Sequence, residues 1–334
     1  MAKQQEKLIE VENLVTYFPI FSGILQKKTG EVKAVDDISF SLWPGETLGI
    51  VGESGSGKSM TAWSILGLVP KPAGRIVGGR ILYRGENLLE KSAFQMREIR
   101  GRHICMVMQD PLTSLNPVFT VGEQLLECLR IDFGRRAKGL LEKATGLLES
   151  VKIPAAESRI SNYPHQMSGG MRQRVVGAIS MARSPSLLIA DEPTTSLDAT
   201  IQLQYLRLLK EIQAETGAAI IFITHDFGIV ARMCDRVAVM YAGKLVEQAE
   251  VVQLFDSPAH PYTEALLKSV PDLNVDVDLL PSIEGQPPAP DDLPEGCSFG
   301  PRCPYVFDKC NEYPIEFDLE PNHVARCWRH ERGN

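Results

Sequence analysis

TLGIVGESGSGKS, residues 47–59, joins a short apolar run to a glycine-rich turn that ends in lysine and serine. The apolar run is typical of a buried strand, and the pattern that follows from Met60 is typical of a helix. The turn matches GxxxxGK[ST], in which backbone N–H groups curl around phosphate oxygens at a helix N-terminus. The sequence therefore predicts a nucleoside triphosphate site at this turn.

Each residue of the turn has an expected task. Lys58 supplies a positive charge for the β- and γ-phosphates, and the hydroxyl of Ser59 ligates Mg²⁺. The glycines let the backbone approach the phosphates closely. The residues expected to surround the nucleotide are Gly52, Glu53, Ser54, Gly55, Ser56, Gly57, Lys58, Ser59 and Met60.

A second motif, LLIADEP at 187–193, supplies two acids at the end of an apolar strand. Asp191 is suited to holding the Mg²⁺ shell beside the phosphate turn. Glu192 follows at once and is expected to polarise the attacking water as a general base. Together the two motifs predict hydrolysis of the nucleotide as well as binding.

The remaining patterns predict an α/β fold. Short apolar runs at 47–53, 103–109, 187–193 and 218–226 indicate buried strands, and helical periodicity appears near 58–68, 138–151, 170–183 and 200–215. Strands that alternate with helices favour a mostly parallel sheet covered by helices. Polar and apolar residues alternate at 8–18, 34–43 and 78–88, which predicts an antiparallel β subdomain beside that core.

Composition excludes several classes of protein. The 334 residues carry 35 basic and 42 acidic side chains, a formal charge of −7, so nucleic acid is not an expected partner. The apolar runs are shorter than the roughly 18 residues of a membrane span, and the first residues lack the apolar core of a secretion signal. Seven cysteines do not form a secreted disulfide pattern, so we expect a cytosolic chain.

Four further motifs reveal a family. Gln109 ends one predicted strand, MSGGM at 167–171 precedes a helix, Ser196-Leu197-Asp198 follows the acidic pair, and His225 ends another strand. In this order, over about residues 8–250, the chain resembles the nucleotide-binding subunits of ABC transporters. The resemblance implies a helical subdomain that carries the signature loop at 167–171 and a dimer that sandwiches two ATP molecules.

The resemblance also implies roles for these residues. Gln109 would reach the Mg²⁺ and the attacking water, and His225 would contact the γ-phosphate. Ser168, Gly169 and Gly170 would bind a phosphate of the ATP held by the opposite subunit. Asp198 would line the seam of the dimer, and an aromatic side chain after the first strand, Phe18 or alternatively Tyr17, would stack on adenine.

Finer features resemble the dipeptide/oligopeptide permease ATPases. They are QDPLTSLNPVFTVGEQL at 109–125, YPHQMSGGMRQRV at 163–175, and HPYTEALLKSVP at 260–271. This implies an ATPase for an importer on the cytoplasmic face of an inner membrane, peripherally attached through its permeases. The implied partners are a second ATPase subunit, two permeases docked on the loop 110–121, and an extracytoplasmic solute-binding protein. Peptides are the expected solute, with nickel, glutathione-like molecules and oligosaccharides as alternatives.

The C-terminal part has a different composition. We expect an ABC-type nucleotide-binding domain over 1–270 and a C-terminal extension over 271–334, which is rich in proline and carries Cys297, Cys303, Cys310 and Cys327. Four cytosolic cysteines indicate a metal site, and their wide spacing favours a [4Fe–4S] cluster over Zn²⁺, as in similar tails of the peptide-permease ATPases. The alternative is four reduced cysteines without metal. The stretch 19–33 is longer than a simple hairpin requires.

Each of two alternative functions predicts specific features. A soluble ABC-type ATPase of DNA repair or translation would carry tandem nucleotide-binding halves, a coiled-coil insertion or a basic surface. This chain has one phosphate turn, no heptad insertion and a net negative charge. A protein that binds ATP without turnover would be unaffected by Glu192→Gln, which distinguishes it from an enzyme.

Overall fold

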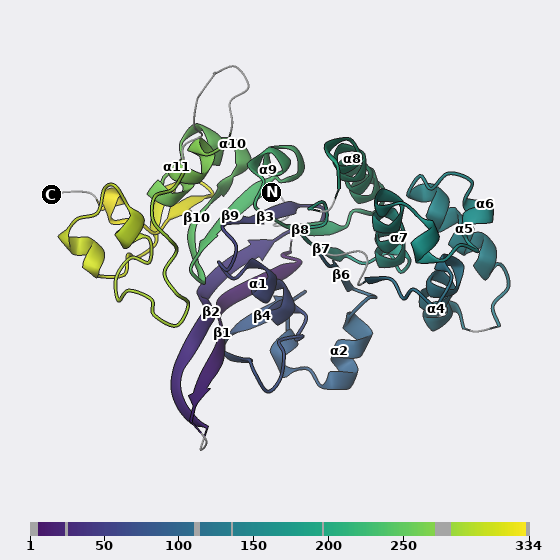
Figure 1. The fold of residues 1–334 in the computed structure, drawn as a ribbon, viewed down its shortest axis with the longest axis horizontal. Coiled ribbons are helices and arrows are strands. Elements are labelled where there is room, and N and C mark those ends of the chain that lie inside the picture. The colour runs from purple at the N-terminus through teal and green to yellow at the C-terminus, as the bar shows by residue number, and fades with distance from the viewer. Residues whose placement is uncertain are drawn as a thin grey trace. The chain divides into compact units, whose positions relative to one another are not determined.

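The computed structural model describes residues 6–23, 26–109, 114–134, 136–195, 197–270 and 282–331. The chain folds into two compact units, drawn together in Figure 1. The first comprises Met1–Trp43, Thr47–Glu90 and Ile223–Asn334, and the second comprises Pro44–Glu46 and Lys91–Phe222. No helix within the described ranges combines the length and apolar character needed to cross a membrane.

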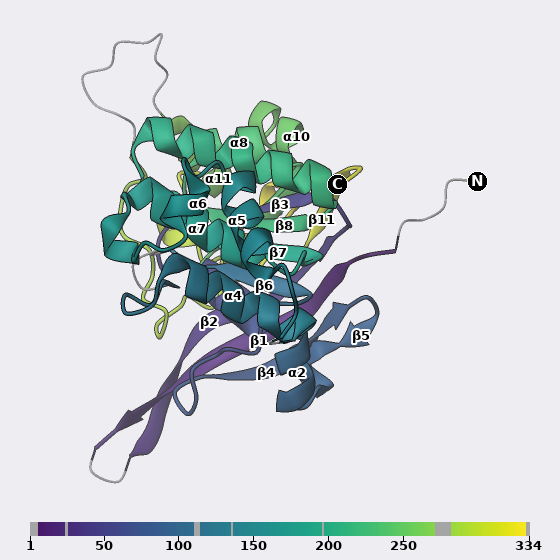
Figure 2. The same ribbon diagram turned by 90° about the vertical axis from the view of Figure 1, so that its right-hand side faces the viewer.

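An antiparallel sheet forms the first part of unit one, in the order β2-β1-β4-β5. Its strands are β1 (Ile9–Ser22), β2 (Lys27–Leu42), β4 (Arg75–Tyr83) and β5 (Glu86–Asn87), followed by the 3-10 turn η1 (Leu88–Glu90). Alternate residues of β1 are buried, as the period of a half-exposed strand requires. The described part of 19–33 forms the far end of the long β1–β2 hairpin, where Ile20 pairs with Gly30 (Figure 2).

The second sheet of unit one has the order β11-β12-β10-β9-β3. Its strands are β3 (Thr47–Val51), β9 (Arg236–Tyr241), β10 (Lys244–Glu250), β11 (Phe317–Glu320) and β12 (His323–Ala325). β3 pairs parallel with β9, whereas β9, β10, β12 and β11 pair antiparallel. Every residue of β3 is buried, so this strand lies in the core of the unit.

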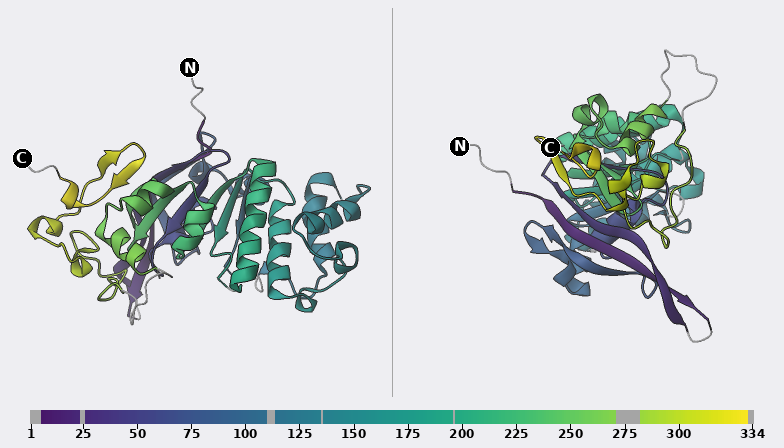
Figure 3. Two further views of the ribbon diagram at one scale, coloured as in Figure 1. Left: turned by 90° about the horizontal axis from the view of Figure 1, so that it is seen from above. Right: turned by 90° about the vertical axis from the view of Figure 1, so that its left-hand side faces the viewer.

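Helices and 3-10 turns complete unit one. The helices are α1 (Lys58–Ile65), α9 (Phe227–Met233), α10 (Val251–Asp256) and α11 (Pro261–Lys268). We call residues 282–331 the C-terminal module. It contains η3 (Gly300–Arg302), η4 (Asp308–Asn311), η5 (Trp328–His330) and the hairpin β11–β12. Figure 3 shows the module in yellow beside the green β10, with which β12 pairs.

Unit two contains parallel strands and most of the helices. β6 (Ile104–Val107) pairs parallel with β7 (Leu187–Asp191), and β8 (Ala219–Thr224), whose first four residues belong to this unit, is the other neighbour of β7. The helices are α2 (Ala93–Ile99), α4 (Val121–Phe133), α5 (Leu140–Ser150), α6 (Ala156–Arg159), α7 (Gly169–Met181) and α8 (Ala199–Thr216), with the 3-10 turn η2 (Pro164–Gln166).

The helices α4–α7 pack as one group (Figure 2). Side chains fix where they begin: Thr120 and Ser168 accept hydrogen bonds from the third backbone N–H of α4 and α7. The guanidinium of Arg183, just after α7, forms a two-pronged ion pair with Asp132 of α4. The predicted mixture of parallel and antiparallel strands with helices is confirmed, and the predicted helices at 58–68, 138–151, 170–183 and 200–215 correspond to α1, α5, α7 and α8.

Candidate functional site

The glycine-rich turn after β3 forms a cradle in unit one. Gly52, Gly55 and Gly57 have positive φ angles of 153°, 79° and 106°. A Cβ atom at Gly52 would lie 2.1 Å from the carbonyl oxygen of Met240, and one at Gly57 would lie 2.2 Å from that of Ala34. Only glycine fits these two positions, and the resulting curl leads directly into the N-terminus of α1.

Lys58 lies at the base of this cradle. Its ammonium group donates to the carbonyl oxygens of Gly52 and Glu53, both at 2.8 Å, and the residue is only 5% exposed. The carbonyls therefore fix a positive charge inside the turn. Ser54, Gly55 and Ser59 are exposed, so the open side of the turn is accessible to an anion.

His225 is the other predicted residue in unit one. It directly follows β8, is exposed, and precedes Asp226, whose carboxylate accepts from the N–H groups of Gly228 and Ile229 at the start of α9. The cap fixes the turn in which His225 lies.

The acidic pair lies in unit two, at the end of β7. Asp191 is the last residue of that strand and is 6% exposed. Glu192 has a positive φ of 44°, and its Oε2 accepts from Gln109 Nε2 and from Thr195 Oγ1, both at 3.0 Å. The structure thus brings together Gln109 and Glu192, which are 83 residues apart in the sequence. Thr195 was not predicted, although it stands three residues after Glu192.

The signature residues begin α7. Ser168 caps this helix, and its hydroxyl accepts from the N–H of Met171 at 3.3 Å. Gly169 is the first helical residue, and a Cβ at Gly170 would lie 2.6 Å from Cγ2 of Ile201 in α8. Asp198 caps α8 by accepting from the N–H groups of Thr200 and Ile201. Ser196 lies outside the described residues.

The two aromatic candidates point to opposite sides of β1, as consecutive strand residues must. The hydroxyl of Tyr17 donates to Asp36 Oδ1 at 2.6 Å, and burial together with this hydrogen bond raises the pKa of Tyr17 above its usual value. Phe18 packs against Gly74, where a Cβ would lie 2.5 Å from its ring. The hydroxyl of Tyr17 is thus committed to Asp36, whereas the ring of Phe18 has no hydroxyl to commit.

The four C-terminal cysteines line one cavity. The residues that line it include Cys297, Cys303, Cys310 and Cys327, together with His260 and Phe299. Burial raises the pKa of Cys297 to about 11 and also raises the pKa values of Cys303 and Cys327. Across the described residues, no three His, Cys, Asp or Glu side chains are grouped as a site for a single metal ion.

His260, which lines the same cavity, has an unsatisfied polar atom. Its Nδ1 accepts from the N–H of Tyr262 at 3.0 Å, so in the neutral ring Nε2 carries the proton. Nε2 is buried and has no hydrogen-bond partner among the described residues. Burial lowers the pKa of His260 to about 4, which keeps the ring neutral at physiological pH. His260 and Tyr262 belong to HPY at 260–262. From the sequence, this stretch was only part of a resemblance to the peptide-permease ATPases, and its residues had no predicted role.

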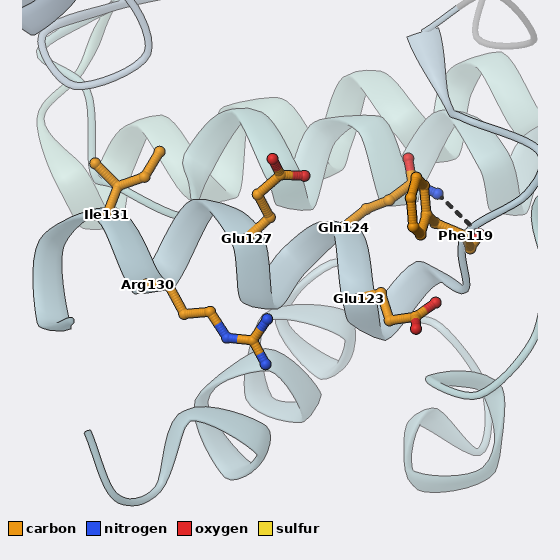
Figure 4. Close-up of a pocket in the computed structure, with 6 residues that line it drawn as sticks. All are labelled: Phe119, Glu123, Gln124, Glu127, Arg130 and Ile131. Carbon is orange, nitrogen blue, oxygen red and sulfur yellow. Dashed lines mark hydrogen bonds between the residues drawn. The ribbon is translucent and has the colours of Figure 1, made fainter. Parts of the chain in front are cut away.

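A surface groove runs along α4 in unit two (Figure 4). It is lined by Phe119, Glu123, Gln124, Glu127, Arg130 and Ile131. The side chain of Gln124 donates to the carbonyl oxygens of Asn116 and Phe119, which fixes the residues just before the helix. Phe119 and Ile131 are 48% and 66% exposed, so the groove presents apolar surface between charged side chains. Residues 110–113 of the predicted docking loop lie outside the described residues.

Two families match the chain. The family described as "ABC transporter" matches residues 35–195, and the family "Oligopeptide/dipeptide transporter, C-terminal region" matches residues 246–310. A probable peptide ABC transporter ATP-binding protein of Sinorhizobium fredii is 50% identical over 325 residues, which is 96% of this chain and 95% of that protein. An oligopeptide transport ATP-binding protein of Bacillus subtilis is 45% identical over 97% of each chain.

Solved structures show the same fold. The dimeric structure of an ATP-binding cassette in a post-hydrolysis state, bound to ADP and Pi, is 23% identical to this chain and matches with a TM-score of 0.62 over 73% of this chain and 98% of that one. A subunit of an ABC transporter complex from Clostridium perfringens is 26% identical and matches with a TM-score of 0.63, over 75% and 92% of the two chains. The chain therefore has the fold of an ATP-binding cassette.

Proposed function

This chain belongs to the family of ABC transporter ATP-binding proteins, in its peptide-transport branch, and on that premise we propose that it hydrolyses ATP to energise import of dipeptides and oligopeptides. As a member of this family it is an ATPase. The observation that carries the proposed mechanism is the hydrogen bond from the Gln109 amide to the Glu192 carboxylate at the end of β7.

We propose that the cradle Gly52–Ser59, with Met60, holds the ATP phosphates. Positive-φ glycines allow backbone N–H groups to face an anion, and Lys58, which two carbonyl groups hold inside the turn, would neutralise the β- and γ-phosphates. The hydroxyl of Ser59, at the first turn of α1, and Gln109 would ligate Mg²⁺, and Asp191 would hold the water shell of the ion. When bound, Mg²⁺ would neutralise charge on the phosphates.

Glu192 is the proposed general base. The amide of Gln109 and the hydroxyl of Thr195 both donate to Oε2, so they orient the carboxylate before water arrives. His225 is proposed to contact the γ-phosphate. Gln109 donates to the proposed base and is also proposed to ligate Mg²⁺, so it would relay the state of hydrolysis to its neighbours.

The remaining site residues are proposed to act in a dimer of ATPase subunits. Ser168, Gly169 and Gly170 stand at the N-terminus of the thirteen-residue helix α7, where backbone N–H groups favour a phosphate of the partner's ATP. Asp198 caps α8 and is proposed to line the seam. Phe18 is proposed to stack on adenine, with Tyr17 as the alternative. The phenyl ring of Phe18 carries no polar atom, so it would recognise the base through its ring face.

The proposed partners are a second, similar ATPase, two permeases and an extracytoplasmic solute-binding protein, which would hold the chain on the cytoplasmic face of an inner membrane. The groove on α4 and the loop 110–121 are the proposed docking surface for the permeases. Exposed Phe119 and Ile131 supply apolar contacts, and Glu123 and Arg130 supply charge (Figure 4).

We propose that the four C-terminal cysteines hold a [4Fe–4S] cluster, with Zn²⁺ as the alternative. The fit rests on two observations: all four line one cavity, and the N–H of His260 at Nε2 has no partner in the described structure, as a donor to sulfur would require. Bound iron and sulfide would tie the module together, and a structural role suits a segment with little apolar core. The division into an ATPase domain over 1–270 and an extension over 271–334 remains part of this proposal.

The test of hydrolysis is Glu192→Gln in the assembled membrane complex. Loss of a general base reduces turnover by about 10²–10⁴-fold, while the phosphate cradle keeps its affinity for ATP. Glu215→Gln, which changes an exposed acid of α8, is the matched control and should retain wild-type turnover. Equal ATPase rates in Glu192→Gln and the control would refute the role of Glu192.

Co-purification of two permeases and a second ATPase with this chain tests the proposed importer. Iron and sulfide analysis of the same sample, with zinc measured alongside, tests the proposed cluster.

A further inference from the structure

Glu53, the second residue of the phosphate cradle, is held from the C-terminal part of the chain. Its backbone N–H donates to the hydroxyl of Tyr262 in α11 at 2.8 Å. Its carboxylate accepts two hydrogen bonds from Arg302, one from Nη1 to Oε2 at 2.7 Å and one from Nη2 to Oε1 at 3.1 Å. A parallel pair of this kind fixes both the position and the orientation of the carboxylate.

Arg302 is itself locked in place. Its Nε donates to the carbonyl oxygen of Glu284 at 3.1 Å, its Nη1 to the hydroxyl of Tyr241 at 3.3 Å, and its Nη2 to the carbonyl oxygen of Ile283 at 3.4 Å. The side chain is only 4% exposed. A guanidinium whose three nitrogens all have protein partners cannot turn to another anion without breaking several contacts.

An aromatic cluster supports both contacts to Glu53. The rings of Tyr241, Tyr262 and Phe299 are mutually packed, with centroids 4.5 to 5.4 Å apart. Tyr262 is fully buried, so its hydroxyl has a fixed position relative to the cradle. Phe299 also lines the cysteine cavity, and Arg302 immediately precedes Cys303. The segment that bears the cysteines is therefore continuous with the segment that holds Glu53.

The charge of Glu53 makes this contact consequential. A carboxylate in a cradle for phosphates repels the anion that the cradle is built to hold, unless a cation neutralises it. Arg302 provides that cation from outside the cradle, while the cradle's glycines leave the backbone around Glu53 intrinsically free. Fixing this backbone in advance reduces the entropy that nucleotide binding would otherwise lose.

We propose that Arg302 of the C-terminal module and Tyr262 of α11, which packs on Phe299 of the module, are positioning residues that set the shape and charge of the phosphate cradle, so that nucleotide affinity depends on the module. This inference rests on the proposed role of Gly52–Ser59 in binding phosphate. It gives the C-terminal module a task at the ATP site that involves no direct contact with the nucleotide.

The experiment is a mutant cycle on the full chain, read by titration with a fluorescent ATP analogue. Arg302→Met leaves the Glu53 carboxylate unneutralised, and we expect nucleotide to bind about tenfold more weakly, as the loss of one charge-assisted pair implies. Glu53→Gln in the Arg302→Met background removes the repulsive charge and should restore most of the lost affinity. A merely structural role for Arg302 would not give this rescue.

Three further variants isolate the causes. Tyr262→Phe removes only the hydroxyl, and we expect weaker binding with faster hydrogen exchange at the amide of Glu53. Arg326→Met is the matched control, because Arg326 pairs with Glu316 inside the module, and it should leave affinity unchanged. In ATPase assays, Arg302→Met should raise KM with kcat retained. If circular dichroism shows that Arg302→Met does not fold, Arg302→Lys is the alternative variant. Lysine keeps the positive charge but cannot form the two parallel hydrogen bonds to Glu53, so Arg302→Lys should bind nucleotide with intermediate affinity.

The outcomes separate this inference from the function on which it rests. Wild-type affinity in Arg302→Met, or a double variant no better than Arg302→Met alone, would overturn the positioning role. Lys58→Ala in the same titration tests the cradle itself. If Lys58→Ala loses nucleotide while Arg302→Met does not, only the positioning role fails, whereas full binding by Lys58→Ala would remove the cradle assignment.

Discussion

Replacing Glu247 by glutamine tests whether one buried carboxylate holds the chain around β10 together. Its Oε1 accepts from the N–H of Ala259 at 2.8 Å and from His323 Nε2 at 2.9 Å, and its Oε2 accepts from the N–H of His260 at 2.8 Å. Glu247 thereby joins β10 to the turn before α11 and to β12 of the C-terminal module.

The expected loss of unfolding free energy follows from the number of buried donors that the substitution leaves without an acceptor. The best orientation of a glutamine keeps its oxygen toward Ala259 and His323 and turns its NH₂ toward the N–H of His260. Two buried donors then face each other without an acceptor. At about 1–3 kcal/mol for each unsatisfied donor, Glu247→Gln should lose about 2–6 kcal/mol of unfolding free energy. With about 2 °C for each kcal/mol in a chain of this size, Tm should fall by about 4–12 °C.

The assay is thermal unfolding at neutral pH, followed by far-ultraviolet circular dichroism and by tryptophan fluorescence, since Trp328 lies in the module. Glu250→Gln is the control: this exposed acid at the end of β10 accepts one hydrogen bond, from Asn322 Nδ2, and its loss should cost less than about 0.5 kcal/mol. Equal Tm values for the two variants would refute the reasoning.

Two other substitutions test the cradle and its neighbourhood. Gly52→Ala places a Cβ 2.1 Å from the carbonyl oxygen of Met240, whereas a Cβ at Gly55 meets nothing within 4 Å. Both variants incur backbone strain because both positions have positive φ. In a thermal melt, only Gly52→Ala should lose much more than about 1 kcal/mol of unfolding free energy. Burial alone would raise the pKa of Asp36, but hydrogen bonds from Lys244 and Tyr17 outweigh it and hold that pKa below its ordinary value of 3.8. A depressed carboxylate pKa stabilises the fold above the unfolded value and loses that effect as pH falls through the folded value. Urea unfolding should therefore show Asp36→Asn less stable than wild type at pH 6, with the difference shrinking below about pH 4; a difference that persists undiminished at pH 3 would contradict this sign.

Local pattern was enough to predict the elements that carry the nucleotide chemistry. The strands β3, β6, β7 and β8 are short and apolar, and each lies within the apolar run that predicted it. β7 ends at Asp191, whereas β6 ends at Val107 and β8 at Thr224, so Gln109 and His225 follow their strands and do not end them. Helices α7 and α8 were also predicted, from helical periodicity at 170–183 and 200–215. Their capping residues Ser168 and Asp198 were found only in the structure. The proximity of Gln109 and Glu192 was expected only from the family resemblance, and the structure shows their hydrogen bond.

The hairpin β9–β10 was not predicted, and in β10 the buried polar residues are the reason. A central strand that carries Glu247 and Gln248 in buried positions does not read as apolar, and their burial is possible only because partners from distant segments satisfy them. The same limit applies to Arg302, whose partner Glu53 is 249 residues away. Interactions of this range leave no period or spacing in the sequence.

The pairing of β12 with β10 also determines what a shortened chain would do. β12 occupies the outer side of β10, where Val324 and Ala325 pair with Gln248 and Glu247. A polypeptide ending near residue 270 would keep the cassette motifs but expose an unpaired strand edge beside Leu245 and Val246, which are buried in the whole chain. Unpaired strand edges of this kind pair with other chains, so the truncated cassette should self-associate by strand addition. Its oligomeric state would therefore differ from that of the intact protein.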